Sequence, residues 1–267
     1  MHPADLLSHI DSGQPWPWPT GAIADGDLDQ AYQMALEVRA QRMARGEKPA
    51  GIKIGFTNRT IWPIYNVHAP IWGTVWDTTL HHFDVQGEGV ASIAGLCQPR
   101  IEPEVVFGLR QSPGATPSMQ DLFDAIEWVA PGFELVQSHL PDWKFVISDT
   151  AADSGLHGQL WIGQKTPVGD LASDARGLAE CLAQAKVELF CDDVKVHAGQ
   201  GANVLDSPLH ALFHVCQVLA DCPGAPELAA GDVITTGTWT DAPPIEASQT
   251  WRAEFDFAPA KIGLLIK

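Results

Sequence analysis

The sequence has few cationic side chains and no long apolar run. Its 267 residues include 16 Lys and Arg against 33 Asp and Glu, a formal net charge of −17 with histidine counted as neutral. A nucleic acid or an acidic membrane surface needs a basic face, and no cluster of Lys and Arg is visible. No run of about 18 apolar residues that could form a transmembrane helix occurs either. We therefore expect neither a nucleic-acid partner nor a membrane partner.

Cysteine and the common catalytic motifs are also scarce. The five cysteines are odd in number and form no Cys-x-x-Cys pair, so a disulfide framework and a sulfur-ligated metal are not predicted. The N-terminus lacks the basic and apolar segments of a secretory signal peptide, which, with reduced thiols, predicts a cytoplasmic protein. No Gly-x-Gly-x-x-Gly, phosphate-binding loop, His-Glu-x-x-His or Gly-x-Ser-x-Gly motif supports a nucleotide cofactor, a zinc protease or a serine hydrolase.

Composition and turn spacing predict a folded α+β protein. Hydrophobic residues make up 45% of the chain and charged residues 18%, an ordinary globular balance. Asp27 and Gln30 are spaced as a capping box at the start of a helix over 27–46, and Ser118 and Ser207 begin helices over 118–131 and from 207 onward. Because strict strand–helix alternation is absent, we expect a mixed or antiparallel sheet. Its strands are predicted at 51–56, 104–109, 133–137, 143–147, 187–197, 232–238, 250–257 and 262–266.

Two glutamates separated by one proline are the most informative feature. Glu102 and Glu104 flank Pro103, which excludes helix and keeps the segment extended. Residues i and i+2 of an extended chain point to the same face, so the two carboxylates lie side by side. They repel each other unless a cation, a shared proton or water compensates. A solvated strand edge is the ordinary explanation for such a pair.

Glu134 adds a third carboxylate, in the apolar run 133–136, where an unpaired charge is costly to bury. Three converging carboxylates would form an oxygen-rich site that suits Mg²⁺ or Mn²⁺ better than Zn²⁺. Spacing alone does not decide between this metal site and three separate solvated side chains.

Two lysines have a similar ambiguity. Lys53 lies between two isoleucines that are themselves flanked by glycines, and Lys144 follows Asp142 and Trp143. Each side chain points either to solvent, the ordinary case for lysine, or into a pocket. An inward ammonium beside anions could hold a substrate carboxylate or transfer a proton.

Taken in order, short blocks of the chain resemble the 2-keto-4-pentenoate hydratase group of the fumarylacetoacetate hydrolase superfamily. The blocks are GIKIGFT at 51–57, PIWGTV at 70–75, PRIEPE at 99–104, EWV at 127–129, ELV at 134–136, DWK at 142–144, DTAAD at 149–153 and AGDVITTG at 230–237. The resemblance implies an α+β fold, a mixed β-sheet roll with an N-terminal helical portion. We expect an extended and helical portion over 1–60 and a catalytic β-roll domain over 61–267, folded as one compact unit.

The resemblance also implies a function. Glu102, Glu104 and Glu134 match the positions that hold Mg²⁺ or Mn²⁺, and Lys53 matches the pocket lysine. Family members of this group add water to 2-hydroxydienoates, the enol forms of unsaturated 2-keto acids from aromatic catabolism, and are generally oligomeric. The expected function is therefore a divalent-metal-dependent hydro-lyase with a small 2-keto acid substrate, assembled as a homo-oligomer.

This sequence departs from the family pattern around the expected metal site. Leu156 stands at the position of the family serine, and His139 stands where arginine is usual. Because these two positions depart from the family pattern, we expect a changed substrate or reaction, with His157 and His139 joining Lys53 as catalytic residues.

The family aspartate near residue 73 falls on Thr78, with Asp77 beside it. Asp77, Trp76, Leu156 and Lys144 are the expected substrate-binding residues. A decarboxylase or a C–C hydrolase on the same scaffold, and a non-catalytic assembly subunit, stay open as alternatives.

Overall fold

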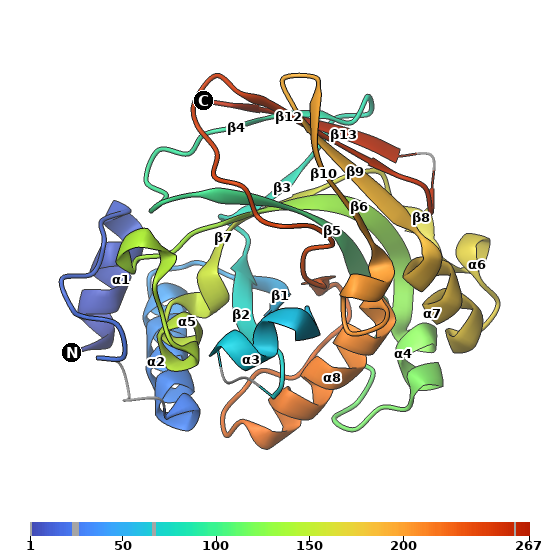
Figure 1. The fold of residues 1–267 in the computed structure, drawn as a ribbon. Coiled ribbons are helices and arrows are strands. Elements are labelled where there is room, and N and C mark those ends of the chain that lie inside the picture. Colours follow the sequence, from blue (N-terminus) through green and yellow to red (C-terminus); the bar gives the residue numbers. More distant parts are fainter. Residues whose placement is uncertain (1, 23–26, 66–67, 259) are drawn as a thin grey trace.

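Two β-sheets and surrounding helices form the protein (Figure 1). The computed structural model describes residues 2–22, 27–65, 68–258 and 260–267. Within these ranges, eight strands make a larger sheet and five make a smaller one, which lies above the larger sheet in Figure 1. This is an α+β architecture with helices at its N-terminal end, as the sequence predicts.

The larger sheet collects strands from most of the chain. These are β1 Pro49–Gly55, β2 Ile71–Trp76, β3 Leu80–His82, β5 Arg100–Leu109, β6 Ile126–Val136, β7 His157–Ile162, β8 Thr166–Pro167 and β11 Val233–Thr235. Their order is β2-β1-β11-β5-β6-β7-β3, with β8 beside β6. β5 and β6 are long antiparallel strands at the centre of the sheet. The expected division at residue 60 stays a prediction, and β1 and β2 on either side of it pair with each other.

The smaller sheet is built mainly from the C-terminal third of the chain. It contains β4 Glu88–Ala91, β9 Lys186–Cys191, β10 Val194–Gln200, β12 Thr250–Phe255 and β13 Ala260–Ile266, in the order β10-β9-β12-β13-β4. The sequence prediction of one strand over 187–197 is wrong. Asp192 and Asp193 adopt positive φ angles of 47° and 64°, so the chain turns there and forms a hairpin.

Helices flank the larger sheet in two groups (Figure 1). α1 Pro3–Ser12, α2 Leu28–Ala44 and α5 Ile147–Ala152 lie together at the left of the view, and α4 Met119–Ala125, α6 Val168–Leu171, α7 Ala175–Gln184 and α8 Pro208–Asp221 lie at the right. α3 Trp62–Tyr65 is a single turn between them. The predicted caps are confirmed: Asp27, Ser118 and Ser207 each accept a hydrogen bond from a backbone N–H of the first turn.

Two other predicted elements are wrong. The helix expected over 118–131 ends at Ala125, because residues 126–136 pair with β5 on one side and with β7 on the other. Tertiary pairing thus overrides the local helical pattern. The strand expected over 143–147 is a 3₁₀ turn, Pro141–Trp143, followed by α5. No helix in the described ranges is long and apolar enough to cross a membrane.

Candidate metal centre and active site

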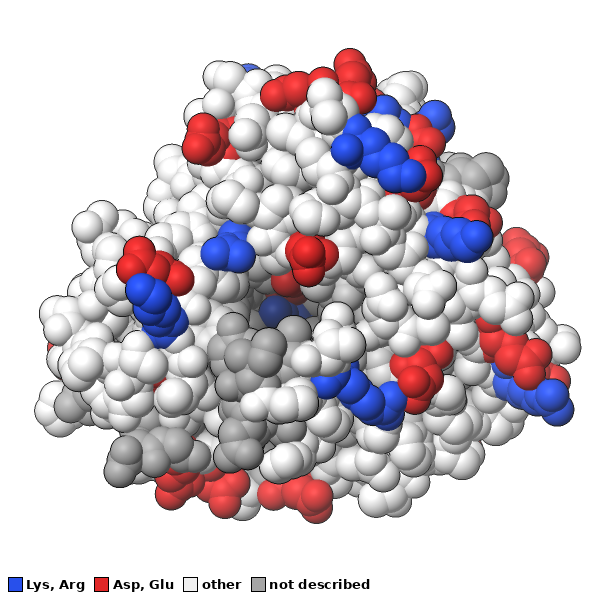
Figure 2. Space-filling model, in the orientation of Figure 1, with Lys and Arg blue, Asp and Glu red and all other residues white. Residues whose placement is uncertain are grey.

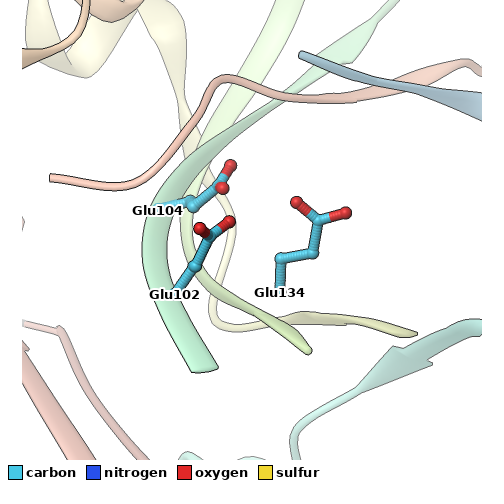
Figure 3. A group of neighbouring side chains, drawn as sticks. All are labelled: Glu102, Glu104 and Glu134. Carbon is cyan, nitrogen blue, oxygen red and sulfur yellow. The ribbon is translucent and has the colours of Figure 1, made fainter. Parts of the chain in front are cut away.

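Three glutamates meet at the centre of the larger sheet. Glu102 and Glu104 come from β5, and Glu134 lies opposite Glu102 in the register of β5 with β6. Figure 3 shows the three carboxyl groups turned toward one another. One carboxylate oxygen from each lies within 4.8 Å of the other two. Glu104 and Glu134 are fully buried, and Glu102 is partly exposed. The solvated-edge explanation is therefore wrong for this trio.

Neighbouring donors fix one oxygen of each fully buried glutamate. Glu104 Oε2 accepts a hydrogen bond from the Gly237 N–H at 2.7 Å and another from the Thr235 hydroxyl. Glu134 Oε1 accepts one from His157 Nδ1 at 2.8 Å. Among the described residues, Glu104 Oε1 has no hydrogen-bond partner, and Glu134 Oε2 has only an ion-pair contact with Lys53. Each side chain thus keeps one oxygen available for a ligand.

Gly237 is required for this arrangement. Its φ is 98°, and a Cβ at this position would lie 1.9 Å from the Thr57 hydroxyl oxygen. Any larger residue would therefore displace the loop that follows β11. The N–H that holds Glu104 depends on the close approach of these two segments.

Lys53 points into the same site, which settles the ambiguity left by the sequence. It is 3% exposed, and its Nζ lies 3.3 Å from Glu134 Oε2. Burial by itself lowers the pKa of Lys53, but the nearby carboxylates outweigh burial and raise this pKa above its ordinary value. The ammonium therefore stays protonated and supplies one positive charge against three carboxyl groups.

Burial and the excess of negative charge raise the pKa values of two of the glutamates. Burial raises the pKa of Glu102 to about 7; Lys53 opposes this shift, and the repulsion of Glu134 adds to it. Burial and repulsion from both other glutamates raise the pKa of Glu104 well above its ordinary value. A divalent cation would remove this penalty, because it replaces repulsion between carboxylates with attraction. The all-oxygen donor set and its inward, unpartnered oxygens fit a hard cation.

A cavity of about 380 Å³ leads to this centre. Figure 2 shows a hollow near the middle of this face, with basic and acidic atoms at its bottom. Lys53 and Glu102 line the polar part of the cavity. Its apolar wall includes Ile54, Phe56, Ile71, Val136, Trp143, Phe145, Leu156 and Ala242. Such a cavity suits a small molecule with one chelating end and an apolar body.

The comparison with known proteins decides the family. The model of the fumarylacetoacetate (FAA) hydrolase C-terminal family matches residues 75–265, more than half of the chain. The chain belongs to this family. It is 34% identical over 224 residues to 2-hydroxyhexa-2,4-dienoate hydratase of Comamonas testosteroni, which covers 82% of this chain and 79% of that protein. It is also 30% identical over 249 residues to 4-oxalocrotonate decarboxylase of a Pseudomonas species, which covers 91% of this chain and 88% of that protein.

Solved structures agree on the fold of this fumarylacetoacetate hydrolase family member. The 4-oxalocrotonate decarboxylase from Pseudomonas putida G7, complexed with magnesium and adipate, matches with a TM-score of 0.88. The match covers 99% of this chain and 95% of that chain at 22% identity, which shows the shared fold. The predicted resemblance and fold class are confirmed.

Neither of the two expected catalytic histidines is among the described residues that line the cavity. His157 lies behind Glu134, with Nδ1 on that carboxylate and Nε2 2.8 Å from the Thr79 hydroxyl. Burial lowers the pKa of His157 and outweighs the hydrogen bond to Glu134. His157 therefore contacts a candidate metal ligand rather than a substrate in the cavity.

His139 lies away from the cavity and contacts the N-terminal segment of this family member. Its ring is fully buried and stacks on Trp16, with ring centroids 5.9 Å apart. Its Nδ1 lies 2.6 Å from Asp153 Oδ1. The predicted catalytic role of His139 has no support from this position.

Of the four expected substrate-binding residues, only Leu156 lines the cavity within the part of the chain that the structure describes. Trp76 is 2% exposed and packs under the guanidinium of Arg42, 4.4 Å from its ring centroid. Asp77 is exposed and accepts a hydrogen bond from the Lys48 N–H at 2.9 Å. The Lys144 side chain is 77% exposed and pairs with Asp142 at 3.3 Å.

Sequence reasoning missed the residues that support the glutamates. Thr235 and Gly237 lie in the AGDVITTG block, which marked the family without indicating a contact with Glu104. Thr79, the partner of His157, gave no sequence signal. Arg100 was detectable, because the alternation that pairs Glu102 with Glu104 also places residue 100 on the same face of β5.

Proposed function

We propose that this protein is a divalent-metal-dependent hydro-lyase, which adds water to a 2-hydroxydienoate, the enol form of an unsaturated 2-keto acid from aromatic catabolism. The observation that carries the proposal is the pair of inward oxygens on Glu104 and Glu134, which lie beside Glu102 and Lys53 at the end of a cavity. The hydratase from Comamonas testosteroni, at 34% identity, supports the reaction class.

Glu102, Glu104 and Glu134 would hold the cation, and their carboxylate oxygens favour Mg²⁺ or Mn²⁺. When bound, such an ion would stabilise the negative charge that develops on the 2-oxo oxygen of a keto acid. Ligation by fixed, buried oxygens leaves the cavity side of the site open for the substrate.

Lys53 has two properties that the reaction needs. Its protonated ammonium lies at the bottom of the cavity, so it can bind a substrate oxygen and return a proton to the dienol. The contact with Glu134 keeps it charged despite burial. Lys53→Met should therefore lower kcat/KM strongly, although the glutamates stay in place.

The apolar wall of the cavity excludes water from one side of the substrate. Leu156 is 6% exposed and adopts a positive φ of 67°, which is rare for a leucine. The surrounding structure holds this conformation against its intrinsic cost, and the side chain faces the cavity. We assign Leu156 to packing against the conjugated chain of the substrate.

Decarboxylation is the second candidate, because 4-oxalocrotonate decarboxylase is 30% identical over 91% of this chain. Purified protein with Mg²⁺ should convert 2-hydroxypenta-2,4-dienoate to a product that has gained one water, measured by loss of ultraviolet absorbance and by mass spectrometry. Release of CO₂ from 2-oxohex-3-enedioate with no hydration would favour the decarboxylase. Turnover that persists after chelation with EDTA would overturn the metal-dependent proposal.

Two further expectations stay predictions. Cytoplasmic location has only the sequence arguments behind it. Homo-oligomer formation rests on the family resemblance, and size-exclusion chromatography with light scattering would test it directly.

A further inference from the structure

A second, small cavity lies between helix α2 and strand β2. Its volume is about 10 Å³, which admits one particle of about the size of a water molecule. It forms where small residues of three elements meet: Ala35 of α2, Gly73 of β2 and Ala151 of α5. Figure 1 shows α2 and α5 next to each other beside β2. Among the described residues, this cavity and the cavity that leads to the glutamates share no lining residue.

The alternation of side chains along β2 explains why the two cavities are separate. Trp72, Thr74 and Trp76 point to one face of the strand and line the small cavity. Ile71 points to the other face and lines the cavity that leads to the glutamates. The small cavity therefore lies on the side of β2 that α2 covers, and it is not part of the candidate active site.

Two buried N–H groups belong to residues that line the small cavity. Neither Nε of Arg39 nor Nε1 of Trp72 has a hydrogen-bond partner in the described part of the chain. Trp72 is 3% exposed, and stacking on Tyr32 fixes its indole, with the ring centroids 5.1 Å apart. Both groups can only donate, and a buried donor without an acceptor is unfavourable. The cavity therefore suits a particle that accepts hydrogen bonds.

Arg39 also carries a positive charge that its neighbours compensate incompletely. Arg42, one turn further along α2, forms an ion pair with Glu47, with Nε 2.8 Å from Oε2. Arg39 instead donates from Nη1 to Met43 Sδ at 3.3 Å, and Asp232 acts on its charge through space, without a hydrogen bond. Burial lowers the pKa of Arg39 and outweighs the attraction of Asp232. A negative charge beside Arg39 would remove this penalty.

We propose that the small cavity binds a single-atom monovalent anion, a halide such as chloride, between the N–H groups of Arg39 and Trp72. A halide accepts hydrogen bonds from both groups and supplies negative charge to the guanidinium, whereas a water molecule supplies no charge. Thr74 and Ser154 also line the cavity, and each has a hydroxyl that can donate a further hydrogen bond. Anions as large as sulfate or phosphate exceed the volume.

A bromide soak tests the site directly, because anomalous scattering distinguishes bromide from water in a crystal. In wild-type crystals soaked in sodium bromide, we expect an anomalous peak between Arg39 Nε and Trp72 Nε1. Bromide at surface positions only, with water or nothing in this cavity, would overturn the proposal. This experiment needs no variant, so it does not depend on whether a substituted chain folds.

Thermal unfolding tests the same site in solution. The purified protein would be compared in sodium chloride and in sodium gluconate at equal ionic strength, so that the screening of surface charges is the same. A bound anion stabilises the folded state by mass action, and we expect chloride to raise Tm by about 2–4 °C relative to gluconate.

Three variants assign this shift in Tm. Arg39→Met keeps the aliphatic stem and removes the guanidinium, and Trp72→Phe keeps a ring that can stack on Tyr32 and removes the N–H. Each should lose most of the chloride-dependent shift. Arg176→Gln changes an arginine whose side chain is 87% exposed on α7, and should keep the shift.

The same shift in Arg39→Met as in Arg176→Gln would identify a general effect of the salt and overturn the proposal. None of these measurements uses Mg²⁺ or turnover. Either result therefore leaves the proposed function unaffected.

Discussion

Two buried histidine–carboxylate pairs lie in this protein, and they differ in how many carboxylate oxygens stay free of hydrogen bonds to the histidine. In the first pair, His157 occupies Oε1 of Glu134, and Oε2 faces Lys53 and the other glutamates. In the second, His139 occupies both oxygens of Asp153, one through Nδ1 at 2.6 Å and the other through its own backbone N–H at 2.9 Å.

The histidines differ in the same way. Nε2 of His157 lies 2.8 Å from the Thr79 hydroxyl, so both ring nitrogens have polar partners. Nε2 of His139 has no hydrogen-bond partner among the described residues, and its ring stacks on Trp16. Residue type and burial therefore do not distinguish the pair beside the candidate metal centre from the pair beside Trp16. The number of carboxylate oxygens left for a ligand does distinguish them.

Replacement of the Glu134 carboxylate in the first pair should give the largest effect on activity. Glu134→Gln leaves an amide in place of the carboxylate, and we expect a loss of roughly 10³-fold in kcat/KM, since a catalytic ion supplies several kcal/mol. The same change removes repulsion from Glu102 and Glu104. Because the change also removes the counter-charge of buried Lys53, the measurement that decides is thermal unfolding with and without Mg²⁺: the variant should no longer be stabilised by Mg²⁺.

Disruption of the second pair should affect folding instead. His139→Ala leaves the Asp153 carboxylate buried without its ring partner and removes the surface on which Trp16 stacks. We expect a loss of about 3 kcal/mol in the free energy of unfolding, measured by urea denaturation. The affinity for Mg²⁺, measured on the folded variant, should stay at the wild-type value. A weakened Mg²⁺ affinity would show that the two pairs are not independent.

His157 should lie between these extremes. His157→Ala frees Glu134 Oε1 to rotate, and loss of such an outer contact weakens metal affinity by roughly 10- to 100-fold. In His157→Asn the amide nitrogen takes about the position of Nδ1, so this variant should recover most of the affinity. Calorimetric titration with Mg²⁺ measures both. Equal weakening in the two variants would contradict a positioning role through the Nδ1 hydrogen bond.

Local rules in the sequence pointed to the members of the candidate metal centre, but they did not decide that the three carboxylates converge. Pro103 keeps Glu102 and Glu104 extended and on one face, and Glu134 falls in an apolar strand. The inward direction of Lys53 could not be read from its own segment, since it depends on pairing of β1 with both β2 and β11.

Contacts between distant segments explain the other differences. Trp16 and His139 are brought together by tertiary packing, and Asp153 joins them from the segment between α5 and β7. No periodicity in the sequence predicts such a contact between distant segments. The same limit explains why Asp77 and Lys144, each adjacent to an aromatic residue in sequence, lie outside the cavity lining in the described chain.

The pH dependence of the free energy of unfolding should be the smallest effect. It should appear at the candidate metal centre beside the first pair and not at the second pair. Glu102 has a pKa raised from 4.5 to about 7 in the folded protein, so the folded state binds more protons than the unfolded state between these values. With respect to this group, metal-free protein should therefore have its full stability at and below about pH 4.5, and lose stability as pH rises to about 7. Water in the cavity screens Glu102, so the expected loss is on the order of 1–2 kcal/mol.

Saturating Mg²⁺ should cancel this loss, because the cation favours the ionised carboxylates. Urea denaturation with and without Mg²⁺ across this pH range measures the difference. Glu102→Gln should abolish it, whereas His139→Ala should lower both curves equally, because the second pair has no oxygen with which to bind the cation. A Mg²⁺-dependent difference that persists in Glu102→Gln would assign the pH dependence to another group, with Glu104 the first candidate because its pKa is also raised.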